Sequence, residues 1–222
     1  MIKVFPSIFA ADFGCLADEA KRIEDAGADG IHVDIMDWHF VPNLTFGPKA
    51  LAAINRSTDL FLDVHIMVYN PYDLVERLIE MGADRITFHF EATENVEETL
   101  KYIQKCGIQV GLAFNPETSY EMAPKFLGKC DLMLFMTVHP GFGGQSFIKK
   151  VMTKVKNLKS DAKKAQIQKP LEIQVDGGIN DQTAKIACQS GANVLVVGTH
   201  LFKQPDLTKG IENLKKCLKD HK

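Results

Sequence analysis

A-G-A-D-G-I-H-V-D-I-M-D, residues 26–37, links the end of a predicted helix to a predicted buried strand. A glycine directly after helical spacing relieves the left-handed backbone that a helix C-terminus often requires. The β-branched, apolar run that follows is typical of a strand buried in a sheet. Inside this run, His32 and Asp34 are two residues apart and therefore project from the same face of the strand. The segment predicts a helix-to-strand unit whose strand carries two polar side chains in the interior.

The same helix–glycine–strand unit recurs around Gly82, Gly107 and Gly191. Together with the remaining apolar runs, these units predict eight strands, each followed by a helix. The predicted strands cover residues 3–7, 30–34, 60–65, 85–88, 109–113, 132–136, 171–175 and 194–197. Because strands that alternate with helices form parallel sheets, eight units in 222 residues predict a single domain, a closed (β/α)8 TIM barrel over residues 1–222. An open doubly wound sheet is disfavoured, since no Gly-x-Gly-x-x-Gly turn follows the first strand.

The composition argues against several classes of partner. The net charge is −2 and no basic block is present, so neither nucleic acid nor an anionic membrane surface is an expected partner. No apolar run approaches the ~18 residues of a membrane-spanning helix. The five cysteines are scattered and form no C-x-x-C pair, so we expect reduced thiols and a cytoplasmic location.

Charged and imidazole side chains gather at the ends of predicted strands, where TIM barrels carry their chemistry. His32 and Asp34 lie on the second strand, His65 on the third and Asp176 at the end of the seventh. A lone His32 would be interpreted as a satisfied core histidine. Two histidines with two carboxylates instead predict a site for one divalent ion, Zn²⁺, Fe²⁺, Mn²⁺ or Co²⁺. Asp63 shares the face of His65 one layer deeper, and we expect it to be structural, a support for a ligand at most.

Three glycine-containing segments follow the last three predicted strands. They are P-G-F-G-G-Q-S-F (140–147), D-G-G (176–178) and G-T (198–199). Backbone N–H groups in such loops can approach phosphate oxygens closely, and TIM barrels often bind phosphate behind the seventh and eighth strands. Turn formation alone would explain any one of the segments, but three adjacent ones predict a phosphate site.

Methionines end three of the predicted strands, and two interpretations of them stay open. Met36, Met67 and Met136 either fill irregular gaps in the core or form an apolar lining over a reacting carbon. His89 and Glu91 follow the fourth strand, but nothing in their spacing requires a place in the site.

Several motifs extend these predictions beyond single residues. They are F-P-S-I (5–8), V-D-I-M-D (33–37), H-F-V-P-N-L-T-F-G-P (39–48), D-V-H-I-M-V (63–68), M-T-V (136–138), P-G-F-G-G-Q (140–145) and V-D-G-G-I (175–179). Together they closely resemble the ribulose-phosphate 3-epimerase family, from Pro6 to Gly198. The resemblance implies a barrel of the ribulose-phosphate-binding type, a divalent metal ion, a sugar phosphate as substrate, a place in the pentose phosphate pathway, and association into a dimer or hexamer.

The resemblance also implies a role for each matching residue. The metal ligands would be His32, Asp34, His65 and Asp176, with Asp34 and Asp176 as the acid–base pair. The substrate-binding residues would be Ser7, His65, Met36, Met67, Met136, Gly143, Gly144, Gly177, Gly178, Gly198 and Thr199. The implied reaction interconverts D-ribulose 5-phosphate and D-xylulose 5-phosphate by a two-base proton transfer through an enediolate.

Departures from the family pattern leave alternatives open. Trp38 stands where the family has glycine, and because tryptophan disfavours a positive φ, we expect this loop to take another conformation. G-T-H-L-F (198–202) is more similar to the sister allulose-6-phosphate 3-epimerases, which keeps that activity as the alternative. A non-catalytic sugar-phosphate-binding barrel is a further alternative. A decarboxylase or aldol-type synthase is disfavoured, because Met36 occupies the place of the lysine those enzymes use.

Overall fold

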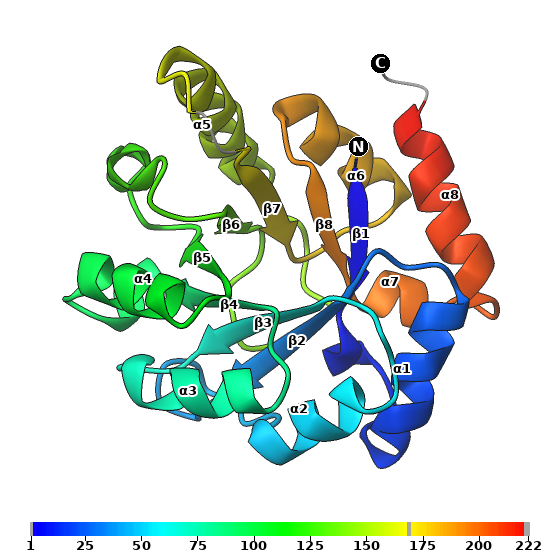
Figure 1. Cartoon of the computed structure of the whole chain (residues 1–222). Coiled ribbons are helices and arrows are strands. Elements are labelled where there is room, and N and C mark those ends of the chain that lie inside the picture. The colour runs from blue at the N-terminus through cyan, green and yellow to red at the C-terminus, as the bar shows by residue number, and fades with distance from the viewer. Residues whose placement is uncertain (1, 168–169, 220–222) are drawn as a thin grey trace.

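Eight strands form the centre of the molecule in this computed structural model, which describes residues 2–167 and 170–219 (Figure 1). The strands are β1 (Lys3–Pro6), β2 (Ile31–Met36), β3 (Leu62–Met67), β4 (Arg85–His89), β5 (Gln109–Phe114), β6 (Leu132–Met136), β7 (Glu172–Asp176) and β8 (Val194–Val197). Their order in the sheet is β1-β8-β7-β6-β5-β4-β3-β2, and the neighbours in this order pair in parallel. All eight predicted strands are present, with bounds that differ by at most two residues.

The two edges of this sheet meet between β1 and β2. Among the described residues, one parallel bridge joins them there, between Ser7 and His32. The sheet is therefore nearly closed into a barrel, and the bridge joins the residue that follows β1 to the second residue of β2. The predicted (β/α)8 barrel is confirmed.

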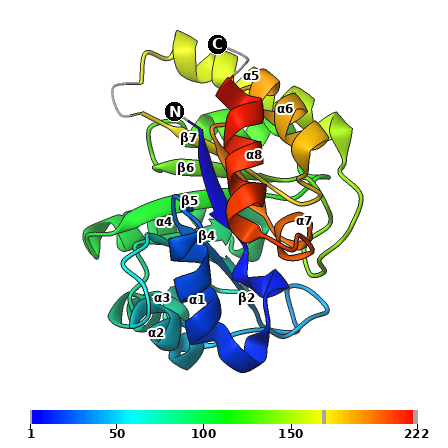
Figure 2. The same cartoon turned by 90° about the vertical axis from the view of Figure 1, so that its right-hand side faces the viewer.

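Helices surround the sheet on its outer face, and each predicted connection contains helical structure. The α-helices are α1 (Leu16–Asp25), α2 (Pro48–Asn55), α3 (Tyr72–Glu80), α4 (Val96–Lys105), α5 (Met152–Lys164), α6 (Asp181–Ser190), α7 (Thr199–Phe202) and α8 (Leu207–Lys219). Short 3₁₀ helices are η1 (Ile8–Ala10), η2 (Phe13–Cys15), η3 (Phe90–Ala92), η4 (Tyr120–Phe126) and η5 (Lys149–Val151). Figure 2 shows α8 lying along β1. None of the helices within the described ranges has the length and apolarity to cross a bilayer.

The connection after β5 differs from the α-helix that the sequence pattern predicts. It folds as the 3₁₀ helix η4, which contains Pro124. Proline has no backbone N–H and its ring clashes with the preceding turn, so a regular α-helix is disfavoured at this point.

The alternation along β2 explains how one strand serves both the core and the site. All six of its residues are buried. Ile31, Val33 and Ile35 belong to the main hydrophobic core, whereas His32 and Asp34 lie on the opposite face, inside the barrel. Burial on both faces is what the near-continuous apolar run predicts for a strand of a parallel sheet.

A buried arginine occupies the barrel interior below the polar cluster. Arg85 is 1% exposed, and its guanidinium packs against the rings of Phe5 and Phe61, at 5.7 and 5.1 Å from their centroids. Its Nε donates to Asp63 Oδ1 at 2.8 Å, and its Nη1 donates to Glu172 Oε2 at 2.6 Å. This arginine therefore compensates the charge of two carboxylates, one of them completely buried.

The loop after β2 does not avoid a positive φ, so the expectation of another conformation at Trp38 is wrong. Trp38 has φ = 66°, and its side chain is exposed. Its backbone N–H donates to Asn43 O at 2.9 Å, while Asp37 Oδ1 accepts from the backbone N–H groups of His39 and Phe40, both at 2.8 Å. These hydrogen bonds tighten the turn and hold tryptophan in the left-handed region.

We therefore expect Trp38→Gly to raise the free energy of unfolding by about 1 kcal/mol. A non-glycine residue in this region carries about 1–3 kcal/mol of strain. Glycine removes this strain, but it also makes the unfolded chain more flexible, which offsets part of the gain. Urea denaturation measures the change. Trp38→Ala, which removes the ring but keeps the strain, is the matched control, and a glycine variant no more stable than it would contradict the expectation.

Candidate metal centre and active site

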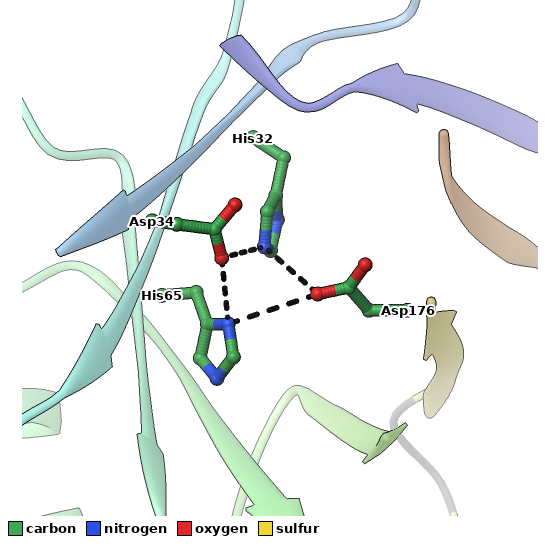
Figure 3. Close-up of side chains that lie close together, drawn as sticks. All are labelled: His32, Asp34, His65 and Asp176. Atoms are coloured by element: carbon green, nitrogen blue, oxygen red, sulfur yellow. Dashed lines mark hydrogen bonds and ion pairs between the residues drawn. The ribbon is translucent and has the colours of Figure 1, made fainter. Parts of the chain in front are cut away.

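Four predicted ligands meet at the C-terminal end of the barrel (Figure 3). His32 and Asp34 come from β2, His65 from β3 and Asp176 from the last position of β7. One nitrogen or carboxylate oxygen from each lies within 4.8 Å of the others. Strand register brings them together, since Asp34 pairs with His65 across β2 and β3.

The two carboxylates flank the two imidazoles. Asp34 Oδ1 lies 3.3 Å from His32 Nε2 and 3.1 Å from His65 Nδ1. Asp176 Oδ2 lies 3.9 Å and 4.0 Å from the same two nitrogens. Figure 3 shows Asp34 and Asp176 on opposite sides of these nitrogens, so all four donor atoms converge on one point.

The environment of His32 fits a metal ligand. Asp63 Oδ2 is 2.9 Å from His32 Nδ1, and because a carboxylate only accepts, the imidazole donates there. In the neutral imidazole Nε2 then carries the lone pair, and this buried atom makes no hydrogen bond to any described residue. A buried, unsatisfied imidazole nitrogen among carboxylates is the donor that Zn²⁺ and related divalent ions prefer. Asp63 is thus the supporting residue that its deeper position on β3 predicts.

The electrostatics of the cluster favour a cation. Burial raises the pKa of Asp176 and the neighbouring Asp34 raises it further, to about 7. Burial opposes ionisation of Asp34 as well, but His32 and His65 keep its pKa below the ordinary value. Burial would lower the pKa of His32, yet the carboxylates of Asp34 and Asp63 raise it well above the ordinary value. A divalent cation at this point would replace the protons that these groups otherwise hold.

His65 also contacts His89 and, through it, Glu91, two residues whose spacing in the sequence does not require a place in the site. Its Nε2 lies 2.9 Å from His89 Nε2, and His89 Nδ1 lies 3.2 Å from Glu91 Oε2. Both histidines are 0% exposed. Burial lowers the pKa of His65 to about 4, which leaves this imidazole neutral at pH 7. The only signal in the sequence was the histidine at the end of the fourth strand.

A cavity opens directly above the cluster. Asp34 and Asp176 reach its wall, whereas His32 and His65 are completely buried beneath it. Ser7 also lines the cavity, and its Oγ donates to Asp34 Oδ2 at 2.7 Å. The other predicted substrate residues that line it are Met36, Met67, Met136, Gly143, Gly144, Gly177, Gly178, Gly198 and Thr199. Of the predicted substrate-binding set, His65 alone does not line the cavity.

The positions of the methionines are compatible with both interpretations, which stay open. Met36, Met67 and Met136 are at most 4% exposed, as core residues are. The same three side chains line the cavity around the two carboxylates. They pack in the core and at the same time form an apolar boundary of the site.

At two positions of the cavity wall, the backbone conformation and the lack of space for a Cβ require glycine. Gly177 has φ = 115°, and a Cβ there would lie 2.4 Å from the Val138 side chain. Gly178 has φ = 66°, and a Cβ there would lie 2.7 Å from the backbone nitrogen of Phe147. Close approach to the loop after β6 therefore explains both glycines, and it leaves bare backbone facing the cavity.

The barrel, its carboxylate–histidine cluster at the C-terminal strand ends and the cavity above it define the class: a TIM-barrel enzyme. The model of the "Ribulose-phosphate 3 epimerase family" matches residues 3–202. The chain belongs to the ribulose-phosphate 3-epimerase family. The family and the enzyme class that the motifs predict are confirmed.

Relatives with the name of this activity are similar over nearly the whole chain. The ribulose-phosphate 3-epimerase of Chlamydia pneumoniae is 52% identical over 206 residues, which cover 93% of this chain and 90% of the relative. That of Bacillus subtilis is 43% identical over 215 residues, 97% of this chain and 99% of the relative. These similarities support ribulose-phosphate 3-epimerase activity and a small-molecule substrate.

Solved structures with other names share the fold at low sequence identity. KGPDC from Streptococcus mutans superposes with a TM-score of 0.74 at 13% identity, over 99% of this chain and 98% of that one. The 3-hexulose-6-phosphate synthase from Salmonella typhimurium has a TM-score of 0.69 at 16% identity, with full coverage of both chains. At this identity the likeness concerns the TIM-barrel fold alone.

Proposed function

We propose that this enzyme is a metal-dependent 3-epimerase that interconverts D-ribulose 5-phosphate and D-xylulose 5-phosphate. The observation that carries the proposal is the placement of Asp34 and Asp176 on opposite sides of the cluster, both at the cavity wall. Inversion at a carbon beside a ketone requires removal of a proton from one face and its return to the other. Two carboxylates that flank one site can do both.

His32, Asp34, His65 and Asp176 would hold the ion, and their donor atoms suit Zn²⁺, Fe²⁺, Mn²⁺ or Co²⁺. When bound, the metal would act as a Lewis acid that stabilises negative charge developing on the substrate oxygens. The rest of the chemistry falls to the side chains of this chain.

One carboxylate would take the C3 proton, which gives a planar enediolate, and the other would return a proton to the opposite face. The Ser7 hydroxyl, bound to Asp34 Oδ2, holds this carboxylate so that its other oxygen faces the cluster. Met36, Met67 and Met136 would exclude water from the carbanionic face of the intermediate. The backbone of Gly143, Gly144, Gly177, Gly178 and Gly198, with Thr199, would bind the phosphate at the same cavity.

A second substrate is favoured by one specific observation. Thr199 and His200, which belong to the segment similar to allulose-6-phosphate 3-epimerases, both line the cavity. D-allulose 6-phosphate is therefore the alternative substrate, to be tested beside the pentose phosphate.

Further expectations accompany the proposal. Residues 1–222 would form one catalytic domain, and the chain would associate into a dimer or hexamer. Its scattered cysteines favour the reducing cytoplasm as the place where it acts.

Exchange of the C3 proton in D₂O, followed by proton NMR, tests the function directly. We expect rapid loss of the C3 signal and epimerisation of D-ribulose 5-phosphate, slower conversion of D-allulose 6-phosphate, and at least a ~100-fold loss of both after chelation, since a Lewis acid contributes several kcal/mol. Activity should return when a divalent ion is added back. A faster reaction of the six-carbon substrate would change the substrate. Undiminished exchange in fully demetallated protein would exclude the metal-dependent reaction.

A further inference from the structure

A hydrogen-bonded relay runs from the cluster through two imidazoles to a carboxylate on the next strand. His65, on β3, has its Nδ1 3.1 Å from Asp34 and its Nε2 2.9 Å from Nε2 of His89. His89 is the last residue of β4, and its Nδ1 is hydrogen-bonded to Glu91 Oε2 in η3. The two rings stack with centroids 5.0 Å apart, and Phe40 packs against His89 at 4.8 Å. Both rings are therefore held by hydrogen bonds and by aromatic packing.

Glu91 is held as an acceptor by the loop after β5. Its Oε1 accepts from the backbone N–H of Asn115 at 2.9 Å and from the hydroxyl of Thr118. Lys154 Nζ donates to the backbone carbonyls of Pro116 and Thr118, which anchors this loop to α5. Burial raises the pKa of Glu91, but the hydrogen bonds from His89, Thr118 and Asn115 bring it below the ordinary value.

The hydrogen bonds can be followed from the carboxylate inward. A carboxylate only accepts, so the proton between Glu91 and His89 sits on His89 Nδ1. In the neutral ring, His89 Nε2 is then an acceptor, and His65 must donate to it from Nε2. His65 Nδ1 is left with its lone pair, and it faces the two aspartates.

Without this relay, the opposite tautomer would compete. Asp34 Oδ1, at 3.1 Å, can accept a hydrogen bond from the N–H of His65 Nδ1, and that tautomer has no Nδ1 lone pair for a cation. Glu91 disfavours this tautomer, because it accepts from His89 Nδ1 and so leaves His89 Nε2 to accept from His65 Nε2. His32 is oriented in the same way from its far side by Asp63.

We propose that His89 and Glu91 are positioning residues, which hold His65 in the tautomer whose Nδ1 lone pair faces Asp34 and Asp176. The inference deepens the proposed function and rests on it, because the lone pair serves a bound cation. Outer partners of this kind typically change metal affinity by about 10–100-fold when they are lost.

Glu91→Gln tests the proposal with almost no change in shape. The amide can donate to His89 Nδ1, which permits the reversed polarity along the relay. We expect Zn²⁺ affinity, measured by calorimetry with the metal alone, to fall about 10–100-fold while the melting temperature of the metal-free protein stays near that of the wild type. Glu94→Gln, the same change at an exposed position three residues on, should bind Zn²⁺ as the wild type does.

Histidine ¹⁵N NMR of the Zn²⁺-loaded protein supplies a readout that mere packing would not change. In the wild type we expect the proton of His65 on Nε2, with His89 protonated on Nδ1. Zn²⁺ affinity within about twofold in Glu91→Gln, or a His65 proton on Nδ1 in the loaded wild type, would overturn the inference. Tight Zn²⁺ binding without turnover would overturn the proposed function alone. A wild-type chain that takes up no Zn²⁺ would overturn both.

Discussion

Asp34→Asn and Asp176→Asn are each expected to lower kcat for epimerisation by at least about 10²–10⁴-fold, with no loss of folded structure. Asparagine preserves the shape of the side chain but can neither take a proton from carbon nor return one. The two carboxylates come from β2 and β7 and face the cluster from opposite sides, so neither can replace the other. Steady-state kinetics at saturating metal, with metal content measured for each variant, separate this effect from weaker binding of the ion.

Isotope exchange makes the same test sharper. An enzyme with one remaining base can exchange the C3 proton of one epimer with D₂O, yet it cannot convert that epimer to the other. Each variant should therefore exchange at most one of the two pentose phosphates. Asp25→Asn, on the exposed surface of α1, is the matched control and should retain full activity. Epimerisation within about tenfold of the wild type in either site variant would exclude the two-base reaction.

Arg85→Met is expected to lower the free energy of unfolding by about 3–5 kcal/mol, the usual effect of leaving a buried charge without its partner. Arg85 is 1% exposed, and its removal would leave the buried Asp63 carboxylate without the guanidinium that compensates its charge, although His32 and Gln174 would still donate to it. Methionine fills a similar volume, so the loss would come from charge rather than from a cavity. Urea denaturation with an unchanged m-value would measure it.

A surface arginine provides the comparison. Arg77 pairs with Glu80 on the exposed face of α3, and Arg77→Met should change stability by no more than about 1 kcal/mol. Arg85→Lys keeps the charge with fewer donors and should fall between the two if Arg85→Met proves too unstable to purify. A loss below about 1 kcal/mol in Arg85→Met would show that Asp63 does not depend on this arginine.

The barrel and the convergence of His32, Asp34, His65 and Asp176 could be predicted because both follow from local periodicity. Residues two apart on a strand share a face, so the strand alone predicts that His32 and Asp34 project together. A glycine after each helix marked where the next strand begins. The C-terminal strand ends of a barrel then converge, which brings His65 and Asp176 to the same place.

The supporting groups could not be predicted, because they depend on geometry between strands. His89 reaches His65 only through the stagger of β4 against β3, where His65 pairs with Thr87. Arg85 begins its strand and would pass for a solvated residue without the neighbouring rings and carboxylates inside the barrel. At Trp38 the local preference against positive φ was overruled by hydrogen bonds across the loop.

The bridge between Ser7 and His32, the one that joins the two sheet edges among the described residues, has a consequence for the order in which the strands assemble. β1 precedes the other seven strands in this sequence, yet its main ladder is with β8, since Lys3 pairs with Val194 and Pro6 with Val197. Until β8 has been synthesised, β1 has little to hold it in the sheet, and long-range pairings of this kind form late. We therefore expect Ser7, which donates to Asp34, to reach its place only after β8 has been synthesised, so that this hydrogen bond of the site forms late.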